Sequence, residues 1–304
     1  MSFRIGVDGG GTKTECILLA APGTVAARHT APGCNPSLVG PERARQILVE
    51  ALQALLANAG VRGSPPEIAA TLLCMAGNSA FWREAATAMT GYGQVTTASD
   101  SLPVLELATG GAPGLVLHAG TGSFVTARAP DGSVHYAGGL GWRFGDAGSG
   151  YDLGRRGVAR ALLELQGWAE RTALGEALCQ HTGAADYAAN SRIFYSAADP
   201  GPRIAAFASR VVDLAGEGCC PAQQVIAQSL SELAALVNAV LPRLFPLART
   251  DAPVPCGASG PILNRPPCFY TLHALAATHA WPVQLHAVTE PPIEGVRRLL
   301  QKTG

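Results

Sequence analysis

The stretch DGGGTKT, residues 8–14, determines which fold the sequence predicts. It separates two short apolar runs, residues 3–7 and 16–20, and a third strand-like run follows at residues 25–30. Glycine lets the backbone approach a ligand closely, and consecutive N–H groups form a concavity that suits phosphate oxygens. The pattern predicts three strands, with a phosphate-binding hairpin between the first two that contains Gly10, Gly11, Thr12, Lys13 and Thr14. The alternative is an ordinary glycine hairpin.

The same arrangement returns further along the chain. Apolar runs at residues 114–118 and 124–128 flank the turn AGTGS, residues 119–123, and a third run follows at residues 133–137. Two copies of strand, glycine turn and strand indicate an internal duplication. Open α/β sheets bind ligands beyond the carboxyl ends of their strands, so two such turns could clamp a nucleoside triphosphate. The second turn would contribute Thr121, Gly122 and Ser123.

Each copy continues into alternating helices and strands, which is typical of an α/β fold. We expect further strands at residues 68–74, 94–99, 253–257 and 282–287. We expect helices at residues 41–59, 80–90, 101–109, 149–166, 264–279 and 294–302, with a largely helical region up to about residue 247. The boundary falls near residues 110–114, which predicts domains at residues 1–113 and 114–290, with residues 291–304 packing back on the first.

The composition indicates a globular protein of about two domains and excludes several classes. Of 304 residues 48% are apolar, and 22 Lys and Arg balance 22 Asp and Glu, so no strongly basic surface for nucleic acid is expected. No apolar run is long enough to predict a membrane span, and residues 225–241 are expected to form a buried helix. The first residues lack a signal-peptide pattern, and the eight cysteines form no Cys-x-x-Cys pair. We therefore expect a reduced, cytoplasmic protein.

Two aspartates at expected strand ends are candidates for chemistry. Asp8 could hold Mg²⁺ directly or through water, and its alternative role is that of a turn residue. Asp100 follows the strand at residues 94–99 and could orient an alcohol and accept its proton during phosphoryl transfer. The alternative for Asp100 is a helix N-cap, and spacing alone does not choose between the two roles.

Three more segments could contribute to a binding site. In the glycine-dense loop at residues 138–150, Asp146 or Ser149 could cap the following helix, Asp146 could bind a sugar hydroxyl, and Trp142 could line a pocket. Asn35 is either a turn residue or a ligand-binding amide. The turn at residues 256–260 could offer a flat backbone surface to an adenine or ribose, or be an ordinary strand-to-helix turn.

These motifs, in this order and approximate spacing, resemble the BadF/BadG/BcrA/BcrD-type ATPase family, which includes the N-acetylglucosamine kinases, within the sugar kinase/Hsp70/actin superfamily. The resemblance covers nearly the whole chain. It implies two duplicated ribonuclease H-like domains, the actin-like ATPase architecture, with an active-site cleft between them. It also implies an ATP- and Mg²⁺-dependent kinase that phosphorylates the 6-hydroxyl of N-acetylglucosamine or, as the alternative, of glucosamine.

The resemblance also implies a role for each motif. In the family, the residue matching Asp100 is the catalytic base and the residue matching Asp8 acts on Mg²⁺. The residues matching Asn35, Gly139, Gly141, Trp142 and Asp146, together with Asp100, line the sugar site. The nucleotide is bound by the two glycine turns and by the residues matching Gly257, Ala258 and Gly260. The expected partners are small molecules, not nucleic acid or membrane, and the chain is compatible with a homodimer.

One departure and two other classes of function stay open. Relatives usually read Gly-Asp-Glu-Gly-Ser where this chain has Ala147 between Asp146 and Gly148, so the substrate preference could differ. The same family includes activators of radical dehydratases or reductases, which need a bridging iron–sulfur cluster, but no cysteine adjoins residues 120–123. A sugar sensor without catalysis is the other alternative, and the presence of both Asp8 and Asp100 argues against it.

Overall fold

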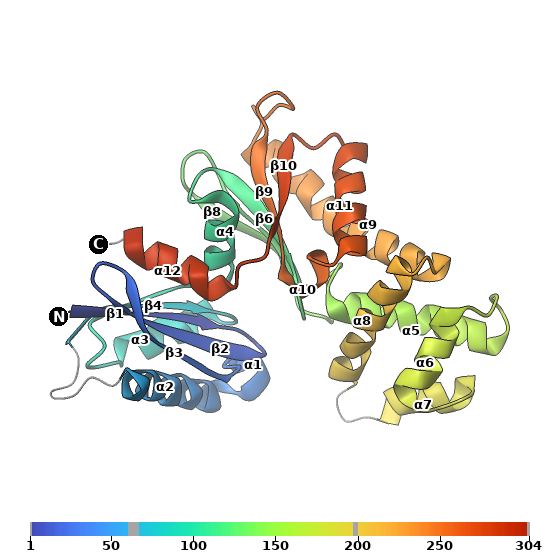
Figure 1. Ribbon diagram of the computed structural model, residues 1–304, viewed down its shortest axis with the longest axis horizontal. Helices are drawn as coiled ribbons and strands as arrows, with labels where there is room; N and C mark the ends of the chain where they lie inside the picture. The colour runs from blue at the N-terminus through green and yellow to red at the C-terminus, as the bar shows by residue number, and fades with distance from the viewer. Residues whose placement is uncertain (1, 60–66, 197–199, 303–304) are drawn as a thin grey trace. The chain divides into compact units, whose positions relative to one another are not determined.

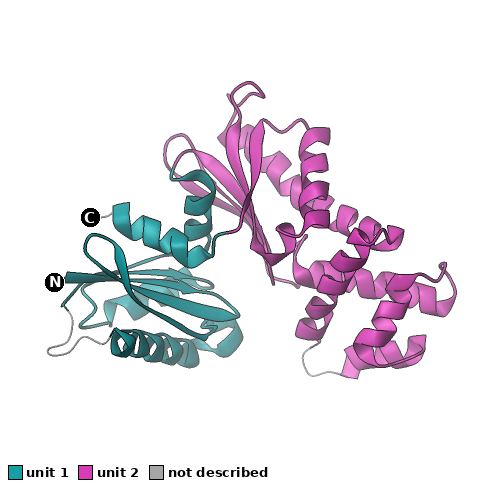
Figure 2. Ribbon diagram, in the orientation of Figure 1, with its two compact units in different colours: residues 1–111, 290–304 teal, residues 112–289 magenta. Residues whose placement is uncertain are grey.

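The computed structural model describes residues 2–59, 67–196 and 200–302. It divides into two compact units, residues 1–111 with 290–304 and residues 112–289 (Figure 2). Residues 197–199, which fall in the helical region that the sequence predicts, lie outside the described residues.

Unit 1 is built on a five-stranded sheet of order β3-β2-β1-β4-β5. The strands β1, β2 and β3, which follow one another in the sequence, pair antiparallel. Strand β1 also pairs parallel with β4, and β4 pairs parallel with β5. The strands are β1 (Ser2–Gly9), β2 (Lys13–Ala20), β3 (Thr24–Pro32), β4 (Glu67–Met75) and β5 (Gln94–Ser99). The expected strands are thus present, and only their ends differ by a few residues.

Helices cover both faces of this sheet because the strands alternate apolar residues on both sides (Figure 1). On one face, Ile5, Val7 and Leu18 pack with the buried stripe of α2 (Pro41–Asn58) and with α3 (Ser79–Thr87). On the other face, Ile17 and Leu19 pack with α12 (Pro292–Lys302), which also contacts α4 (Ser101–Thr109). The short helix α1 (Pro36–Val39) precedes α2.

The C-terminal helix α12 packs on unit 1, although the intervening chain builds unit 2. A Cβ on Gly6 would lie 2.7 Å from Val296 Cγ1, so the glycine allows α12 to approach β1 closely. Lys302 Nζ lies 2.5 Å from the buried carboxylate of Glu106, and Arg28 pairs with Glu294. Apolar packing and ion pairs therefore both hold α12 on the sheet.

Unit 2 repeats the strand arrangement of unit 1, with the order β10-β9-β6-β7-β8. Here β6 pairs antiparallel with β7, β7 with β8, and β6, β9 and β10 run parallel. The strands are β6 (Gly114–Ala119), β7 (Ser123–Arg128), β8 (Val134–Gly138), β9 (Val254–Ser259) and β10 (Val283–Val288). The matching order and directions confirm the predicted duplicated α/β fold.

Between β8 and β9 the chain is helical, as expected. The helices are α5 (Gly150–Gln166), α6 (Ala173–Thr182), α7 (Tyr187–Ser196), α8 (Gly201–Gly216) and α9 (Cys220–Leu244). The helix expected at residues 264–279 is present as α11 (Pro266–Thr278), and a short helix that was not expected, α10 (Gly260–Leu263), precedes it. Two prolines, Pro266 and Pro267, begin α11, where their missing N–H groups leave no unmet hydrogen bond.

Among the described residues, α9 alone is long and apolar enough to cross a membrane by length and composition. Its apolar residues Ile226, Leu230, Leu233 and Val237 are buried in the core of unit 2, where α9 packs against α8, α11 and α5. This is the buried face that the spacing predicts. The helix is therefore accounted for as a core element.

Candidate active site

The first glycine turn joins β1 to β2 in unit 1. The Gly10 N–H donates to the Lys13 carbonyl at 2.9 Å, and the Gly33 N–H donates to the Thr12 carbonyl at 3.1 Å. These bonds hold the turn against the end of β3, while Gly11, Thr12 and Lys13 remain exposed. The turn therefore presents the accessible backbone that the phosphate hypothesis requires.

Two side chains of this turn already have partners. Thr14 is fully buried, and its hydroxyl donates to the Pro32 carbonyl at 2.9 Å. Thr14, which the sequence places in the phosphate-binding hairpin, thus uses its hydroxyl to tie β2 to β3. Lys13 Nζ lies 2.6 Å from the Glu15 carboxylate, which partly neutralises the charge that the turn offers.

Asp8 is the next-to-last residue of β1, directly before the glycines, and is 9% exposed. Burial, above all, and then the nearby charges of Asp100 and Glu15 raise the pKa of the Asp8 carboxyl to about 7, while Lys13 lowers it. A divalent cation beside this carboxylate would relieve both the burial and the repulsion, so Asp8 is chemically suited to Mg²⁺. No group of three potential metal ligands (His, Cys, Asp or Glu) occurs among the described residues.

Asp100 follows β5, so it lies at the same carboxyl edge of the sheet as Asp8. It occupies the N-cap position of α4, yet its side chain makes no capping hydrogen bond. The Ser99 hydroxyl donates to its Oδ1 at 3.3 Å, and burial raises the pKa of the carboxyl despite that bond. The side chain thus forms no capping hydrogen bond to α4, although the Asp100 and Ser101 N–H groups lower the pKa of the carboxyl.

Asn35 serves as a turn residue, which is one of the two roles that the sequence leaves open. It is the N-cap of α1, where its Oδ1 accepts the Ser37 N–H at 3.0 Å. A Cβ on Gly77 would lie 2.5 Å from the same oxygen, so the loop after β4 lies against this side chain. The side-chain carbonyl of Asn35 therefore serves the turn before α1 and lies against the loop after β4.

The second glycine turn joins β6 to β7 in unit 2 and is bound to the loop before α5. The Gly150 N–H donates to the Gly120 carbonyl at 2.8 Å, and the Gly139 N–H donates to the Ser123 carbonyl at 3.0 Å. Ser123 is buried, and its hydroxyl donates to the Ala147 carbonyl at 2.6 Å. The Ser123 hydroxyl thus ties the turn to the loop before α5. Thr121, by contrast, is exposed.

Asp146 lies where the glycine-dense loop meets this turn. Its backbone is left-handed, with φ 63°, and its Oδ1 accepts the Gly141 N–H at 3.2 Å. A Cβ on Gly122 would lie 2.9 Å from Asp146 Oδ2. Burial raises the pKa of this carboxyl, against the lowering effect of the Gly141 and Ser123 N–H groups. Asp146 thus orders the loop and the turn together.

The structure also shows which residue caps α5 and where the aromatic residue of this loop lies. Ser149, rather than Asp146, caps α5, because its Oγ accepts the Asp152 N–H at 3.2 Å. Trp142 is about half exposed, and its ring lies 5.1 Å from the ring of Tyr151. Gly139 and Gly141 both have positive φ, which fits the sharp path of this loop.

The segment at residues 256–260, the last that we expected to bind the nucleotide, lies mostly inside a strand. Gly257 and Ala258 are buried inside β9, where β6 and β10 flank them, so they present no free backbone surface. The turn begins at Gly260, with φ 93°, where a Cβ would lie 2.4 Å from the Ala119 carbonyl oxygen. The segment therefore approaches the second glycine turn at Gly260.

His118 is a residue of this region that the sequence did not single out. Its Nδ1 lies 3.3 Å from Ser259 Oγ, and its ring stacks on Phe124 at 4.9 Å. Burial lowers the pKa of this imidazole to about 4, so it is neutral at physiological pH. Its position directly before the second glycine turn could have marked His118 as part of the site. A single histidine that belongs to no motif, however, carries little information by itself.

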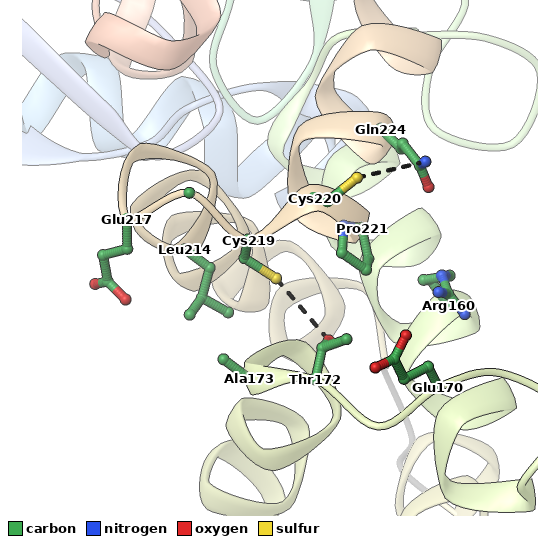
Figure 3. A pocket seen from close by; sticks show the side chains of 11 residues that line it. Arg160, Glu170, Thr172, Ala173, Leu214, Glu217, Cys219, Cys220, Pro221 and Gln224 are labelled. Carbon is green, nitrogen blue, oxygen red and sulfur yellow. Dashed lines mark hydrogen bonds between the residues drawn. The ribbon is translucent and has the colours of Figure 1, made fainter.

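A separate cavity of about 530 Å³ lies between the loop before α6 and the start of α9 (Figure 3). None of the predicted site residues lines it. Cys219 Sγ points to Thr172 Oγ1 at 3.9 Å, whereas Cys220 Sγ receives the Gln224 amide at 3.7 Å (Figure 3). The two thiols are free and face different partners, so the structure does not favour a redox pair.

The two five-stranded sheets of equal topology, each with a glycine turn after its first strand, define an actin-like ATPase fold. The chain belongs to the BadF/BadG/BcrA/BcrD ATPase family, whose sequence model matches residues 5–249. A crystal structure of a candidate N-acetylglucosamine kinase from Chromobacterium violaceum is 26% identical, with 98% of each chain covered and a TM-score of 0.76. This similarity over nearly the full chain confirms the predicted architecture.

Two curated relatives match over shorter regions. The N-acetylmuramic acid/N-acetylglucosamine kinase of Clostridium acetobutylicum is 26% identical over 179 residues, which are 57% of this chain and 58% of that protein. The N-acetyl-D-glucosamine kinase of Dictyostelium discoideum is 29% identical over 163 residues, or 49% and 51%. The chain thus matches little more than half the length of these curated relatives.

Proposed function

We propose that the protein is an ATP-dependent amino-sugar kinase that phosphorylates the 6-hydroxyl of N-acetylglucosamine, with glucosamine as the alternative substrate. The observation that carries the proposal is the pair Asp8 and Asp100, a buried and a partly buried carboxylate at one edge of the unit 1 sheet. Membership of an ATPase family and similarity to proteins described as amino-sugar kinases support it.

The nucleotide phosphates would meet the exposed backbone at residues 10–12 and at Thr121. Gly260 would contribute backbone beside the second turn, and Lys13 a partly neutralised positive charge. Asp8 would hold Mg²⁺ directly or through water, and the ion, when bound, supplies charge stabilisation to the transferring phosphoryl group. Thr14 and Ser123 act indirectly, because their hydroxyls fix the turns.

Asp100 would orient the sugar hydroxyl and accept its proton. A general base works best when its pKa lies near the working pH, and burial moves the pKa of Asp100 upward, in that direction. Asn35 and Asp146, together with Trp142, would position the sugar. Phosphoryl transfer requires mainly such positioning and charge stabilisation.

The direct test is ADP release, measured with ATP and Mg²⁺ across N-acetylglucosamine, glucosamine, glucose and other hexoses. We expect release that depends on an amino sugar, and phosphorus NMR of the product should place the phosphate on the 6-oxygen. ADP release that no hexose stimulates would remove the kinase proposal. Sugar binding without ADP release would favour a sensor.

A further inference from the structure

One peptide group in the loop before α5 is hydrogen-bonded on both sides. Its carbonyl, that of Ala147, accepts the Ser123 hydroxyl of the second glycine turn at 2.6 Å. Its N–H, that of Gly148, donates to Ser229 Oγ of α9 at 2.9 Å. Because a peptide group is planar and rigid, a bond that fixes the N–H also fixes the carbonyl. Ser229 is therefore connected to the second glycine turn through this single group.

Ser229 is in turn held by a buried carboxylate. Its hydroxyl donates to Asp152 Oδ2 at 2.6 Å, and both residues are buried. Arg156 Nε donates to the same oxygen at 2.8 Å, and Arg155 Nη2 donates to Asp152 Oδ1 at 2.8 Å. Burial acts to raise the pKa of the Asp152 carboxyl, but these hydrogen bonds outweigh it and hold the pKa below its ordinary value. Asp152 is therefore ionised at neutral pH.

The charge of Asp152 sets the direction of each hydrogen bond in this chain. An ionised carboxylate only accepts, so the Ser229 proton points to Asp152 and the Ser229 oxygen is left to accept the Gly148 N–H. On the other side of the peptide group, the carbonyl can only accept, so the Ser123 hydroxyl donates to it. The bonds thus all point toward one negative charge, and hydrogen bonds aligned in this way strengthen one another.

The same stretch of loop meets the second glycine turn again two residues later. The Gly150 N–H donates to the Gly120 carbonyl at 2.8 Å, so residues 147–150 are bonded to both ends of the turn. The hydrogen bond that Asp146 accepts from the Gly141 N–H lies within the loop and does not involve Ser229. A change at Ser229 should therefore affect the turn more than the residues assigned to the sugar.

We propose that Asp152 and Ser229 are positioning residues, which hold the second glycine turn in the shape that receives the nucleotide. This inference rests on the proposed function, because it takes that turn as a phosphate site. Both residues would act only through the peptide group between Ala147 and Gly148. They lie 77 positions apart in the sequence, and only the packing of α9 beside α5 brings them together.

The test measures, by calorimetry, the affinity for the non-hydrolysable ATP analogue AMPPNP with Mg²⁺ and the affinity for N-acetylglucosamine. Ser229→Ala leaves the buried Gly148 N–H without its acceptor, so it should weaken AMPPNP by about tenfold and the sugar by less than about threefold. Asp152→Asn, which keeps the size of the side chain, should act in the same direction. The double variant should be little weaker than Ser229→Ala alone, because both changes break one hydrogen-bond chain.

Ser231→Ala is the matched control, because Ser231 lies on the same helix but is exposed and donates to the Ala227 carbonyl within that helix. It should change neither affinity by more than about twofold. Circular dichroism and the thermal unfolding midpoint show which variants are folded. If Ser229→Ala does not fold, Asp152→Asn decides.

An unchanged AMPPNP affinity in the folded variants would overturn the inference, even if N-acetylglucosamine is phosphorylated. Equal losses for AMPPNP and the sugar would also overturn it, because they indicate a general structural role. ADP release with each hexose is measured separately. If no hexose stimulates it while Ser229→Ala still weakens AMPPNP, the kinase proposal is overturned and the positioning role is supported. A wild type that does not bind AMPPNP would overturn both.

Discussion

At the scale of single residues, Asp100 is the side chain on which the proposed chemistry depends. It stands at a helix N-cap position without capping, so its replacement should affect turnover more than folding. We predict that Asp100→Asn lowers kcat by about 10²–10⁴-fold, because asparagine cannot accept the proton. Sugar binding by calorimetry and the thermal unfolding midpoint should stay close to wild type.

The matched control is Asp251→Asn, an exposed aspartate whose side chain pairs with Arg249. It should keep normal turnover. Near-normal turnover in Asp100→Asn would exclude this residue as the base, whatever the family resemblance implies.

Asp8 gives a prediction about pH. Its pKa is about 7 in the folded protein, against 3.8 for an ordinary aspartate, so between these pH values the folded state binds more protons than the unfolded state. The contribution of Asp8 to stability therefore falls as pH rises through this window. In EDTA at pH 8, Asp8→Asn should be more stable than wild type by up to about 4 kcal/mol, since one pKa unit is about 1.4 kcal/mol.

Urea unfolding at pH 5 and pH 8 measures this effect. The difference between Asp8→Asn and wild type should shrink at the lower pH, and Mg²⁺ with ATP should stabilise the wild type only. A stability difference that is equal at both pH values would contradict the raised pKa.

At the scale of elements, the turn after β9 depends on one glycine. Gly260 has φ 93°, and a Cβ there would clash with the Ala119 carbonyl beside the second glycine turn. We predict that Gly260→Ala lowers the free energy of unfolding by about 1–3 kcal/mol and raises the KM for ATP. The measurement combines urea unfolding with initial rates at varied ATP.

The variant Gly183→Ala separates the cost of a positive φ from the cost of a steric clash at the Cβ. Gly183 ends α6 with φ 77°, but nothing lies within 4 Å of its Cβ position. It should show only the cost of the left-handed backbone, about 1 kcal/mol, and an unchanged KM for ATP. Equal effects in both variants would mean that contact with Ala119 is unimportant.

At the scale of the whole molecule, unit 1 is completed by the last helix of the chain. Leu300 is 2% exposed and packs with Ile17 and Leu19 of β2. We predict that Leu300→Ala destabilises unit 1 by about 2–5 kcal/mol, as expected for a buried leucine. Hydrogen exchange should show the loss of protection in β1 and β2, with a smaller loss for the partly buried Leu299→Ala. Unchanged protection in β1 would show that α12 is dispensable.

Local patterns were sufficient to predict the strands, most helices, the duplication and the glycine turns, because alternation and turn chemistry are properties of neighbouring residues. They also placed Asp8 and Asp100 at strand ends. Only the tertiary structure decided which side chains are free. Thr14 and Ser123 are bonded to Pro32 and Ala147, and Gly257 lies inside a sheet.

A cavity of about 620 Å³ beside Trp142 shows the same limit. Its charge depends on Arg143 of the loop before α5, on Arg155 of α5, and on Glu232 of α9, which follows much later in the sequence. A hydrogen bond or an ion pair is settled by whichever group folding brings within about 3 Å, and no local pattern records that group. The sequence therefore determined the architecture and the candidate residues, and the fold determined which of them a ligand can reach.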